Sequence, residues 1–491
     1  MSSSMAKDFI VAIELGSSKM TGIAGQKNLD GSISVLAVAK EESSAFIRKG
    51  VVYNIDKTAQ CLQNIIKKLE SQLKTRIKQV YVGVGGQSIR GVRNVVTKEL
   101  AAGTIVTDAM VDELVDSNRN MNYTDQEILD TAVQEYKVDS QYQQDPVGIQ
   151  CTRLEGNYLN ILQRKGFYKN FNKCFEVAGI AIAEMLNAPL ALADAVLTEA
   201  ERRSGCALID IGADTTTVSV YTKNFLRHIA VIPLGGANIT KDIATLQMEE
   251  SDAEKMKLKY ASAYTDNNEI DNNLKYSIDQ DRQVESRRFI EIVEGRTEEI
   301  VENAWYQVPS EYCDKLLGGI ILTGGGANLK NIERAFQNHT HIEKIRIAKF
   351  PSHTITGGND DIKSKNGMMC TVLGLLSKGD INCAGVPIDP NGDLFGGQTA
   401  SGSSAAGNTP DQRPARKPGE VPAGVVMTEA EKQKAEEEAR LKREQEEREA
   451  REKAEAEAAE AARVKRENSK WNKFKKGIVN FGKQIMTGDD D

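Results

Sequence analysis

The feature that most constrains the fold of this chain is a strand–turn–strand pattern that occurs twice, at residues 9–24 and 207–221. In each copy an apolar run ends in a carboxylate, which is followed by glycine, by small hydroxyl residues and by a second apolar run. Apolar runs of this length predict buried strands, and the short polar linker predicts a hairpin turn. Two such hairpins so far apart in sequence predict two similar domains that close on one ligand.

The residues of the two turns favour a phosphate ligand together with a metal ion. A tight turn brings backbone N–H groups and hydroxyls together, and such donors suit phosphate oxygens. The carboxylate of Asp210 does not suit phosphate directly, so we expect a hydrated Mg²⁺ between the two. One hairpin alone fits an ordinary polar turn equally well, but a second copy with Glu14 in the same place favours a shared phosphate site.

A third glycine-rich stretch also favours an anionic ligand. Residues 319–322 predict a buried strand that ends in three glycines and is followed by a helix at 332–337. Close approach of backbone to a ligand needs residues without Cβ, and a helix N-terminus favours an anion. The alternative is a glycine-rich strand–helix turn that binds nothing.

Composition limits the classes of protein to which this chain could belong. A chain of 491 residues is too long for one core, so two or more domains are expected. A net charge of −7 does not suggest nucleic-acid binding, and four histidines form no metal-ligand cluster. Seven cysteines without a C-x-x-C pair predict free buried thiols in a reducing compartment. Neither a signal peptide nor an apolar run of about 20 residues is visible.

The pattern of apolar residues predicts an α/β fold of several parts. Apolar residues at helical spacing predict a helix at 55–73. Two helices are expected within 166–205, the second at 190–203, and residues 250–317 are expected to be helical and polar. The predicted parts are a first half (7–83 and 166–205), an α+β insert (84–165), a second half (206–240 and 318–385) and an outer subdomain (241–317).

The C-terminal quarter has a different composition. Residues 386–427 are rich in Gly, Ser, Ala, Asn and Pro and predict a flexible linker. Residues 428–468 carry near-balanced charges at helical spacing, which predicts a solvated helix of about 60 Å if it is continuous. They lack the apolar positions of a coiled coil.

The last segment, 470–486, predicts an amphipathic helix in a lipid headgroup layer, because bulky apolar residues share one face and lysines occupy much of the rest. The alternative is a helix that docks on the protein's own body or on a partner. The predicted membrane-binding residues are Trp471, Phe474, Ile478, Phe481, Ile485, Lys473, Lys475, Lys476 and Lys483.

Together the two hairpins, the Gly-Gly-x-x-Ile-Thr helix start at 235–240 and the Leu-Thr-Gly-Gly-Gly-Ala stretch at 322–327 resemble the actin/Hsp70/sugar-kinase ATPase superfamily. With the insert and the amphipathic tail, the chain is most similar to the FtsA family of bacterial cell-division proteins, over about residues 7–385. The resemblance implies an actin-like fold of two related lobes that bind ATP and Mg²⁺ between them.

The resemblance also implies roles for individual residues. It places Glu14 and Asp210 at the catalytic centre, with Asp210 holding Mg²⁺ through water. Gly235 and Gly236 would hinge the two halves, while Glu254 and Lys257 would meet the ribose and adenine. The implied nucleotide-binding residues are Gly16, Ser17, Ser18, Lys19, Gly212, Thr215, Thr216, Gly235, Gly236, Glu254, Lys257, Gly324, Gly325 and Gly326.

Partners are implied in the same way. The insert would contact later division proteins, and the outer subdomain would receive the C-terminal tail of the tubulin-like protein FtsZ. Arg288 and Arg296 are candidates for binding that acidic peptide, or are ordinary surface charges. The implied protein self-associates into filaments and tethers FtsZ to the cytoplasmic face of the inner membrane at the division septum.

Two departures from the family pattern bear on catalysis. Glu14 stands where the superfamily usually has Asp, and Ala213 and Asp214 stand where relatives usually have glycines. We therefore expect weak hydrolysis, with ATP acting mainly as a structural ligand. The alternatives are an actin-like ATPase of pilus assembly or cell shape and a metabolic kinase of the same superfamily; a chaperone is nearly excluded, because linker and charged helix follow the ATPase region.

Overall fold

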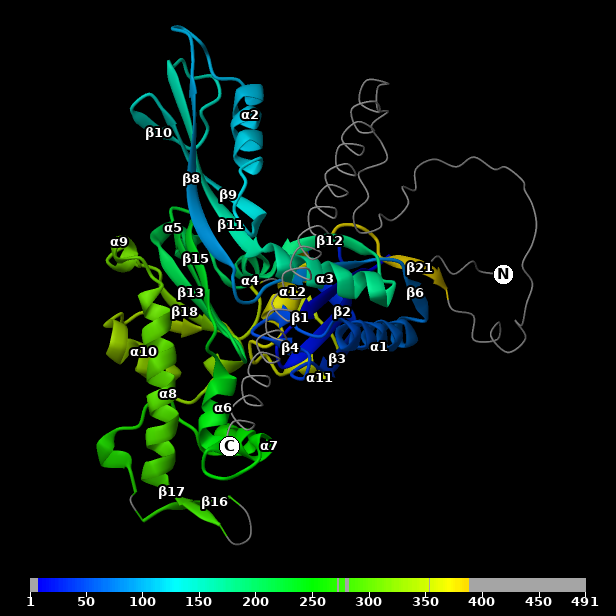
Figure 1. Ribbon diagram of the computed structural model, residues 1–491, viewed down its shortest axis with the longest axis vertical. Coiled ribbons are helices and arrows are strands. Elements are labelled where there is room, and N and C mark those ends of the chain that lie inside the picture. The colour runs from blue at the N-terminus through cyan, green and yellow to red at the C-terminus, as the bar shows by residue number, and fades with distance from the viewer. Residues whose placement is uncertain (1–7, 272, 279–281, 353, 388–491) are drawn as a thin grey trace, which may run out of the picture. The chain divides into compact units, whose positions relative to one another are not determined.

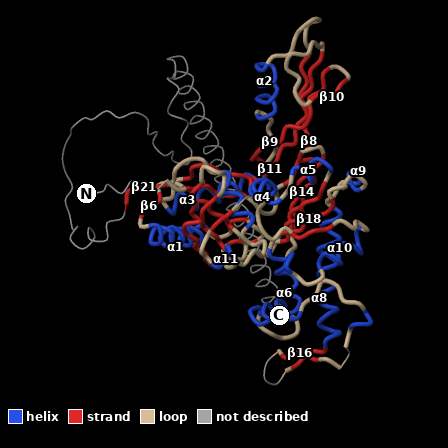
Figure 2. The backbone as a smooth tube through the Cα atoms, turned by 180° about the vertical axis from the view of Figure 1, so that it is seen from behind, coloured by secondary structure: helices blue, strands red, loops and turns tan. Residues whose placement is uncertain are grey.

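The structure is a computed structural model that describes residues 8–271, 273–278, 282–352 and 354–387 (Figure 1). The predicted charged spacer and the predicted amphipathic helix lie outside these residues, as does the predicted linker beyond residue 387. Two large sheets organise the described part, one of six strands and one of nine, with helices packed on both (Figure 2).

The six-stranded sheet is built around the first predicted hairpin. Strand β1 (Ile10–Leu15) pairs antiparallel with β2 (Lys19–Lys27) and runs parallel to β7 (Val80–Val84). β1 and β7 are buried almost throughout, which explains their continuous apolar sequence. The sheet is completed by β12 (Ile182–Asn187) beside β7, and by β3 (Ile33–Glu42) and β20 (Ile355–Thr356) beyond β2.

Helix α1 (Ile55–Leu73) covers the residues for which helical spacing predicted a helix, and it packs against β2 and β3. It begins after Asn54, whose side chain accepts a hydrogen bond from the Lys57 N–H at 3.0 Å. An added Cβ at Gly22 would lie 2.4 Å from Ile65 Cγ2, so a glycine in β2 allows the helix to approach the sheet closely.

The nine-stranded sheet joins two stretches that are distant in sequence. The second predicted hairpin, β13 (Cys206–Ile211) with β14 (Thr216–Thr222), is confirmed and forms its centre with β15 (Phe225–Ile232) and β18 (Gly319–Thr323). β15 then meets the insert's strand β8 (Arg90–Glu99) through the pair Ala230 and Arg90. The remaining strands are β11 (Arg153–Arg164), β9 (Gln126–Val138) and β10 (Gln141–Gln143) beyond β8, and β19 (Ile345–Ile347) beside β18.

A buried polar network fixes α2 (Asp108–Arg119) to the insert's strands. Asn118 and Asn160 exchange two amide hydrogen bonds of 2.7 and 3.0 Å, and Thr131 donates to Asn160 at 3.0 Å. Since both asparagines are fully buried, these pairings specify how the helix sits on the sheet.

Helices α6 (Gly236–Ala244), α7 (Glu250–Tyr260) and α8 (Ser286–Tyr306) pack together beside the nine-stranded sheet. The remaining elements are β4 (Ile47–Arg48), β5 (Val51–Val52), β6 (Thr75–Ile77), α3 (Lys165–Ala178), α4 (Ala188–Val196), α5 (Glu199–Ser204), η1 (Asn267–Glu269), β16 (Lys275–Ser277), β17 (Gln283–Glu285), α9 (Ser310–Cys313), η2 (Gly325–Asn328), α10 (Ile332–Thr340), α11 (Asp360–Lys363), α12 (Cys370–Lys378) and β21 (Ala384–Pro387).

Three sequence-based expectations are wrong. The helix predicted at 190–203 is two helices, α4 and α5, because Leu197 is extended and Thr198 begins α5 with a capping box. Strand β12 lies where only helices were expected, and the hairpin β16–β17 interrupts the stretch 250–317 that was expected to be helical.

The assignment of all of 318–385 to the second half is also contradicted. β20 pairs with β3, α12 packs against β1, β2 and β7, and β21 pairs with β6. Apolar residues of α12 such as Leu375 belong to the same core as β1. The chain therefore returns to the six-stranded sheet from about residue 355 onward, and α12 buries apolar side chains against it.

Candidate functional site

The two predicted acidic turns occupy equivalent places in the two sheets. Glu14 is the fifth residue of the six-residue strand β1, and Asp210 is the fifth residue of the six-residue strand β13. Each strand has an antiparallel hairpin partner on one side and a parallel neighbour on the other, with Glu14 beside Gly83 and Asp210 beside Thr323. Both carboxylates thus emerge near the carboxyl end of a central strand, where ligand sites of open α/β sheets lie.

The two carboxyls influence one another across the site. Burial raises the pKa of Glu14 to about 8, and the negative charge of Asp210 acts in the same direction, while Lys40 and a hydrogen bond from Thr371 oppose the rise. Burial also raises the pKa of Asp210 to about 6. Two neighbouring carboxyls that are costly to ionise are a natural place for a cation, and hard oxygen donors suit Mg²⁺.

The first turn is held by backbone contacts. The Ser43 hydroxyl donates to the Gly16 carbonyl at 2.6 Å, and an added Cβ at Gly16 would lie 2.5 Å from the Lys19 carbonyl oxygen. The Ser17 hydroxyl accepts from the Gly50 N–H at 2.8 Å, and the Ser18 carbonyl accepts from Ser43. The Lys19 side chain is 56% exposed and lies 3.7 Å from Glu42, which leaves its ammonium near the surface.

The second turn is closed by a hydrogen bond from the Gly212 N–H to the Thr215 carbonyl at 2.8 Å. Thr216 is fully buried, and its hydroxyl donates to the Leu234 carbonyl at 2.9 Å. The structure therefore brings Gly212 and Thr215 to the turn, whereas the Thr216 hydroxyl is engaged by the backbone.

Glycines allow the neighbouring segments to approach this second turn closely. The Gly236 N–H donates to the Gly212 carbonyl at 2.9 Å, and an added Cβ at Gly235 would lie 2.6 Å from the Ala213 carbonyl oxygen. The N-terminus of α6 is thereby fixed against the turn. Because the N–H groups of Gly236 and Ala237 donate to turn carbonyls, it is the positive end of the helix dipole that favours an anion here.

The loop 324–326 contacts the carboxylate itself. Gly324 has a φ of +85°, and an added Cβ there would lie 2.4 Å from Asp210 Oδ1. An added Cβ at Gly326 would lie 2.3 Å from Ile211 Cγ2, while Gly325 has room, with Met368 at 3.7 Å. Close packing on β13 thus requires glycine at 324 and 326, whereas the expected approach of this loop to a ligand stays a prediction.

Glu254 and Lys257 complete this group of residues from α7. The Lys257 ammonium donates to the Gly236 carbonyl at 3.0 Å and to the Thr240 hydroxyl at 2.9 Å, and it forms an ion pair with Glu254 at 2.7 Å. An added Cβ at Gly236 would lie 4.0 Å from Gly326 Cα, so this cluster adjoins the glycine loop.

The candidate peptide-binding arginines lie elsewhere, on α8. Arg296 pairs with Asp242 at 2.5 Å and with Glu299, and it lines a cavity of about 350 Å³ between α6 and α8. Arg288 is exposed. The structure therefore does not bring these two side chains to the acidic turns.

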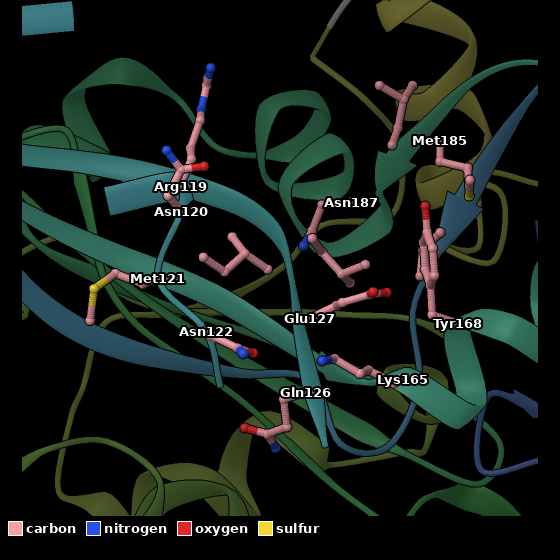
Figure 3. A pocket seen from close by; sticks show the side chains of 14 residues that line it. Arg119, Asn120, Met121, Asn122, Gln126, Glu127, Lys165, Tyr168, Met185 and Asn187 are labelled. Carbon is pink, nitrogen blue, oxygen red and sulfur yellow. The ribbon is translucent and has the colours of Figure 1, made fainter. Parts of the chain in front are cut away.

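A larger cavity, of about 660 Å³, lies where the insert meets the six-stranded sheet (Figure 3). Glu127, Lys165 and Asn187 line it. The Asn187 side-chain oxygen accepts from the Leu190 N–H at 3.3 Å, while its buried Nδ2 has no hydrogen-bond partner among the described residues. None of the predicted nucleotide-binding residues lines this cavity.

Several site residues were not foreseen. Ser43 and Gly50 bond to the first turn, and Thr371 and Lys40 act on Glu14, and no pattern in the sequence links these residues to the turn.

No helix within the described ranges is both long and apolar enough to cross a bilayer, and all seven cysteines are free.

Comparisons with known proteins identify relatives of two regions and of most of the chain. A family model described as "Cell division protein FtsA" matches residues 207–374, and one described as "SHS2 domain inserted in FTSA" matches residues 86–162. Cell division protein FtsA of Porphyromonas gingivalis is 31% identical over 66% of this chain and 69% of its own length. FtsA of Neisseria meningitidis serogroup B is 31% identical over 66% of this chain and 80% of its own length.

A solved structure shares the fold at low sequence identity. A chain of the PilM-PilN type IV pilus biogenesis complex superposes with a TM-score of 0.53 at 14% identity, covering 79% of this chain and 100% of that one.

Proposed function

This chain belongs to the FtsA family of cell division proteins, and from that premise we propose that it binds ATP with Mg²⁺ between its two acidic turns and tethers FtsZ filaments to the inner face of the cytoplasmic membrane. Its fold is the actin-like ATPase fold expected from the sequence. A role in cell division follows from the family, while the ligand, partners and location are the proposal.

The observation that carries the proposal is the convergence of Glu14 and Asp210, in equivalent strand positions, beside a glycine cradle. Gly324 packs on the Asp210 carboxylate, and the N-terminus of α6 packs on the turn that follows it. In this arrangement the turn N–H groups would bind the phosphates, and the positive end of the α6 dipole would attract them. Asp210 would hold Mg²⁺ through water, and the metal would neutralise phosphate charge.

Glu254 and Lys257 support binding of the nucleoside at the same site. Their ion pair holds both side chains beside Gly236 and, through it, near Gly326. A ribose placed there would find a carboxylate acceptor and an ammonium donor already oriented. Lys19, 56% exposed and loosely paired with Glu42, is free to turn toward the phosphates.

We propose that hydrolysis is weak and that ATP is mainly a structural ligand. Glu14 stands where the superfamily usually has Asp, and its side chain is one methylene longer, which displaces the carboxylate from the place where it would orient the attacking water. Asp214 adds negative charge close to the expected phosphates. A turnover near the median enzyme rate of about 10 s⁻¹ would contradict this part of the proposal.

The proposed partners rest on fewer observations than the proposed nucleotide site. For the FtsZ tail, Arg288 offers an exposed cation, whereas Arg296 would have to release Asp242 or share its charge. For later division proteins, the cavity lined by Glu127, Lys165 and Asn187 offers both charges and a buried amide donor at the edge of the insert. For the membrane and for filaments, the support is the sequence of 470–486 and the family.

The competing functions are an actin-like ATPase of another pathway and a metabolic kinase. Fold similarity to a pilus protein does not favour the former, because 14% identity shows the fold alone. Identity of 31% over 80% of a curated FtsA favours the cell-division role.

A reconstitution tests the proposal. Fluorescent FtsZ filaments should be recruited to anionic vesicles by the full chain with ATP and Mg²⁺, and FtsZ lacking its C-terminal tail should stay in solution. Recruitment of both forms of FtsZ, or of neither, would contradict the tether.

A further inference from the structure

The tip of a small hairpin touches both acidic turns. Strands β4 and β5 are joined by Lys49 and Gly50, whose φ angles are +52° and +71°. Positive φ at both central residues is typical of a type I′ two-residue hairpin, which favours Asn, Asp or Gly and is strained for lysine. The conformation aims the backbone N–H groups of the tip outward.

Three backbone groups of the tip form hydrogen bonds to other segments. The Gly50 N–H donates to the Ser17 hydroxyl of the first turn at 2.8 Å. The Lys49 N–H donates to Asp214 Oδ2 of the second turn at 3.1 Å. The Lys49 carbonyl accepts from the Gln87 N–H at 2.8 Å, which secures the tip from a third side.

Both ends of this connection are anchored in the fold. An added Cβ at Gly50 would lie 2.4 Å from Gly86 Cα, so the tip is packed against the start of the insert. On the other side, the Ala213 carbonyl next to Asp214 accepts from the Ala237 N–H at 2.7 Å, which ties the second turn to α6. When the tip stays with the first turn, separation of the two turns must therefore break the bond between Lys49 and Asp214.

We propose that Asp214 is a latch residue: by accepting the Lys49 N–H it holds the two acidic turns together and slows the release of bound nucleotide. The inference rests on the proposed nucleotide site and adds to it a retention device. It also gives a role to the departure from glycine at this position, since glycine has no side chain with which to accept the bond.

Charge and hydrogen bonding make opposite predictions for Asp214, which makes the latch testable. The negative charge repels phosphates, so removing it alone should slow nucleotide release or leave it unchanged. The hydrogen bond joins the turns, so removing it should accelerate release. Asp214→Asn removes the charge but keeps a side-chain carbonyl oxygen, whereas Asp214→Ala removes both.

The test measures release of a fluorescent ATP analogue from the full chain by stopped flow, in the presence of Mg²⁺. We expect Asp214→Ala to release the analogue about fivefold faster than Asp214→Asn, which corresponds to one hydrogen bond. Equal release rates for the two variants, or slower release from Asp214→Ala, would overturn the latch.

Hydrogen exchange of the Lys49 amide separates this inference from the proposed function, because it needs no nucleotide. In the nucleotide-free protein the amide should exchange about fivefold faster in Asp214→Ala than in wild type, with Asp214→Asn close to wild type. Unchanged exchange in Asp214→Ala would show that the contact does not hold the turns. If the wild type binds no nucleotide, the proposed function and the role of Asp214 in retaining nucleotide are both overturned. The exchange result would then still report whether Asp214 accepts the Lys49 N–H.

Discussion

Glu14 and Asp210, from strands of different sheets, lie within electrostatic reach of one another: burial first and the charge of Asp210 second raise the pKa of Glu14 to about 8. Neither carboxyl has a cation fixed beside it at hydrogen-bond distance in the described structure. Lys40 acts to lower the pKa of Glu14, but its ammonium pairs with Asp361 at 2.8 Å. The pair is therefore arranged for a cation that arrives with the ligand.

The first prediction concerns stability as a function of pH. The pKa of Glu14 is raised from 4.5 to about 8 and that of Asp210 from 3.8 to about 6, so the folded protein binds protons that the unfolded chain has lost. Between about pH 4 and pH 8 the free energy of unfolding of the nucleotide-free protein should fall as pH rises. Chemical denaturation of wild type and Glu14→Gln at pH 5.5 and pH 8 measures this, and wild type should lose more stability. Equal losses of unfolding free energy in the two proteins would contradict the raised pKa of Glu14.

The second prediction concerns the glycine that packs on Asp210. Gly324→Ala places a Cβ 2.4 Å from Asp210 Oδ1 at a φ of +85°, so it should lower the free energy of unfolding by about 1–3 kcal/mol and weaken ATP binding. Gly358→Ala is the matched control, because no heavy atom lies within 4 Å of its added Cβ. Equal effects of the two substitutions in thermal melts would argue against the close packing.

The third prediction distinguishes the two arginines of α8. Arg288→Glu should weaken binding of an FtsZ tail peptide about fivefold in fluorescence anisotropy and leave the melting temperature unchanged. Arg296→Ala should instead lower stability by about 1 kcal/mol, because it leaves Asp242 without its partner. Arg203→Glu, on α5 and 67% exposed, is the control for charge reversal. A peptide affinity that is indifferent to Arg288 would remove it from the binding surface.

The fourth prediction concerns the C-terminal segment, which lies outside the described residues. Trp471→Glu should reduce co-sedimentation with anionic liposomes at least tenfold, since interfacial burial of a large apolar side chain contributes up to about 1.5–3 kcal/mol. Asn472→Glu adds the same charge about 100° away on a helix and should have a smaller effect. If both variants were released equally, charge rather than the apolar face would explain attachment.

The sequence was most informative where apolar patterning is strong. The hairpins around Glu14 and Asp210 and the helix α1 could be predicted, because buried strands and an amphipathic helix leave clear periodicities. Strand β9 was not predicted, since its residues 126–132 are half-exposed on both faces and show no alternation. Strand β12 contains Ala, Glu, Met and Leu, which favour helix, and its pairing with β7 outweighs that preference.

The candidate site shows the same limit. Glu14, Asp210 and the glycines could be identified because turns demand particular residue types locally. Thr371 could not, because it reaches Glu14 only after the chain has returned from the nine-stranded sheet to the six-stranded one. Contacts made by such a return depend on packing, which short-range patterns do not encode. The same holds for Asp214, whose partner Lys49 is 165 residues away.

The most direct test of the account is the calorimetric affinity of the full chain for ATP with Mg²⁺, compared among wild type, Asp210→Ala and Asp360→Ala. Asp360 is fully exposed on α11 and serves as an Asp-to-Ala control away from the two turns. We predict micromolar binding by wild type and Asp360→Ala, no measurable binding by Asp210→Ala, and similar melting of all three nucleotide-free proteins. Micromolar binding retained by Asp210→Ala would contradict the central claim that the two acidic turns bind one nucleotide.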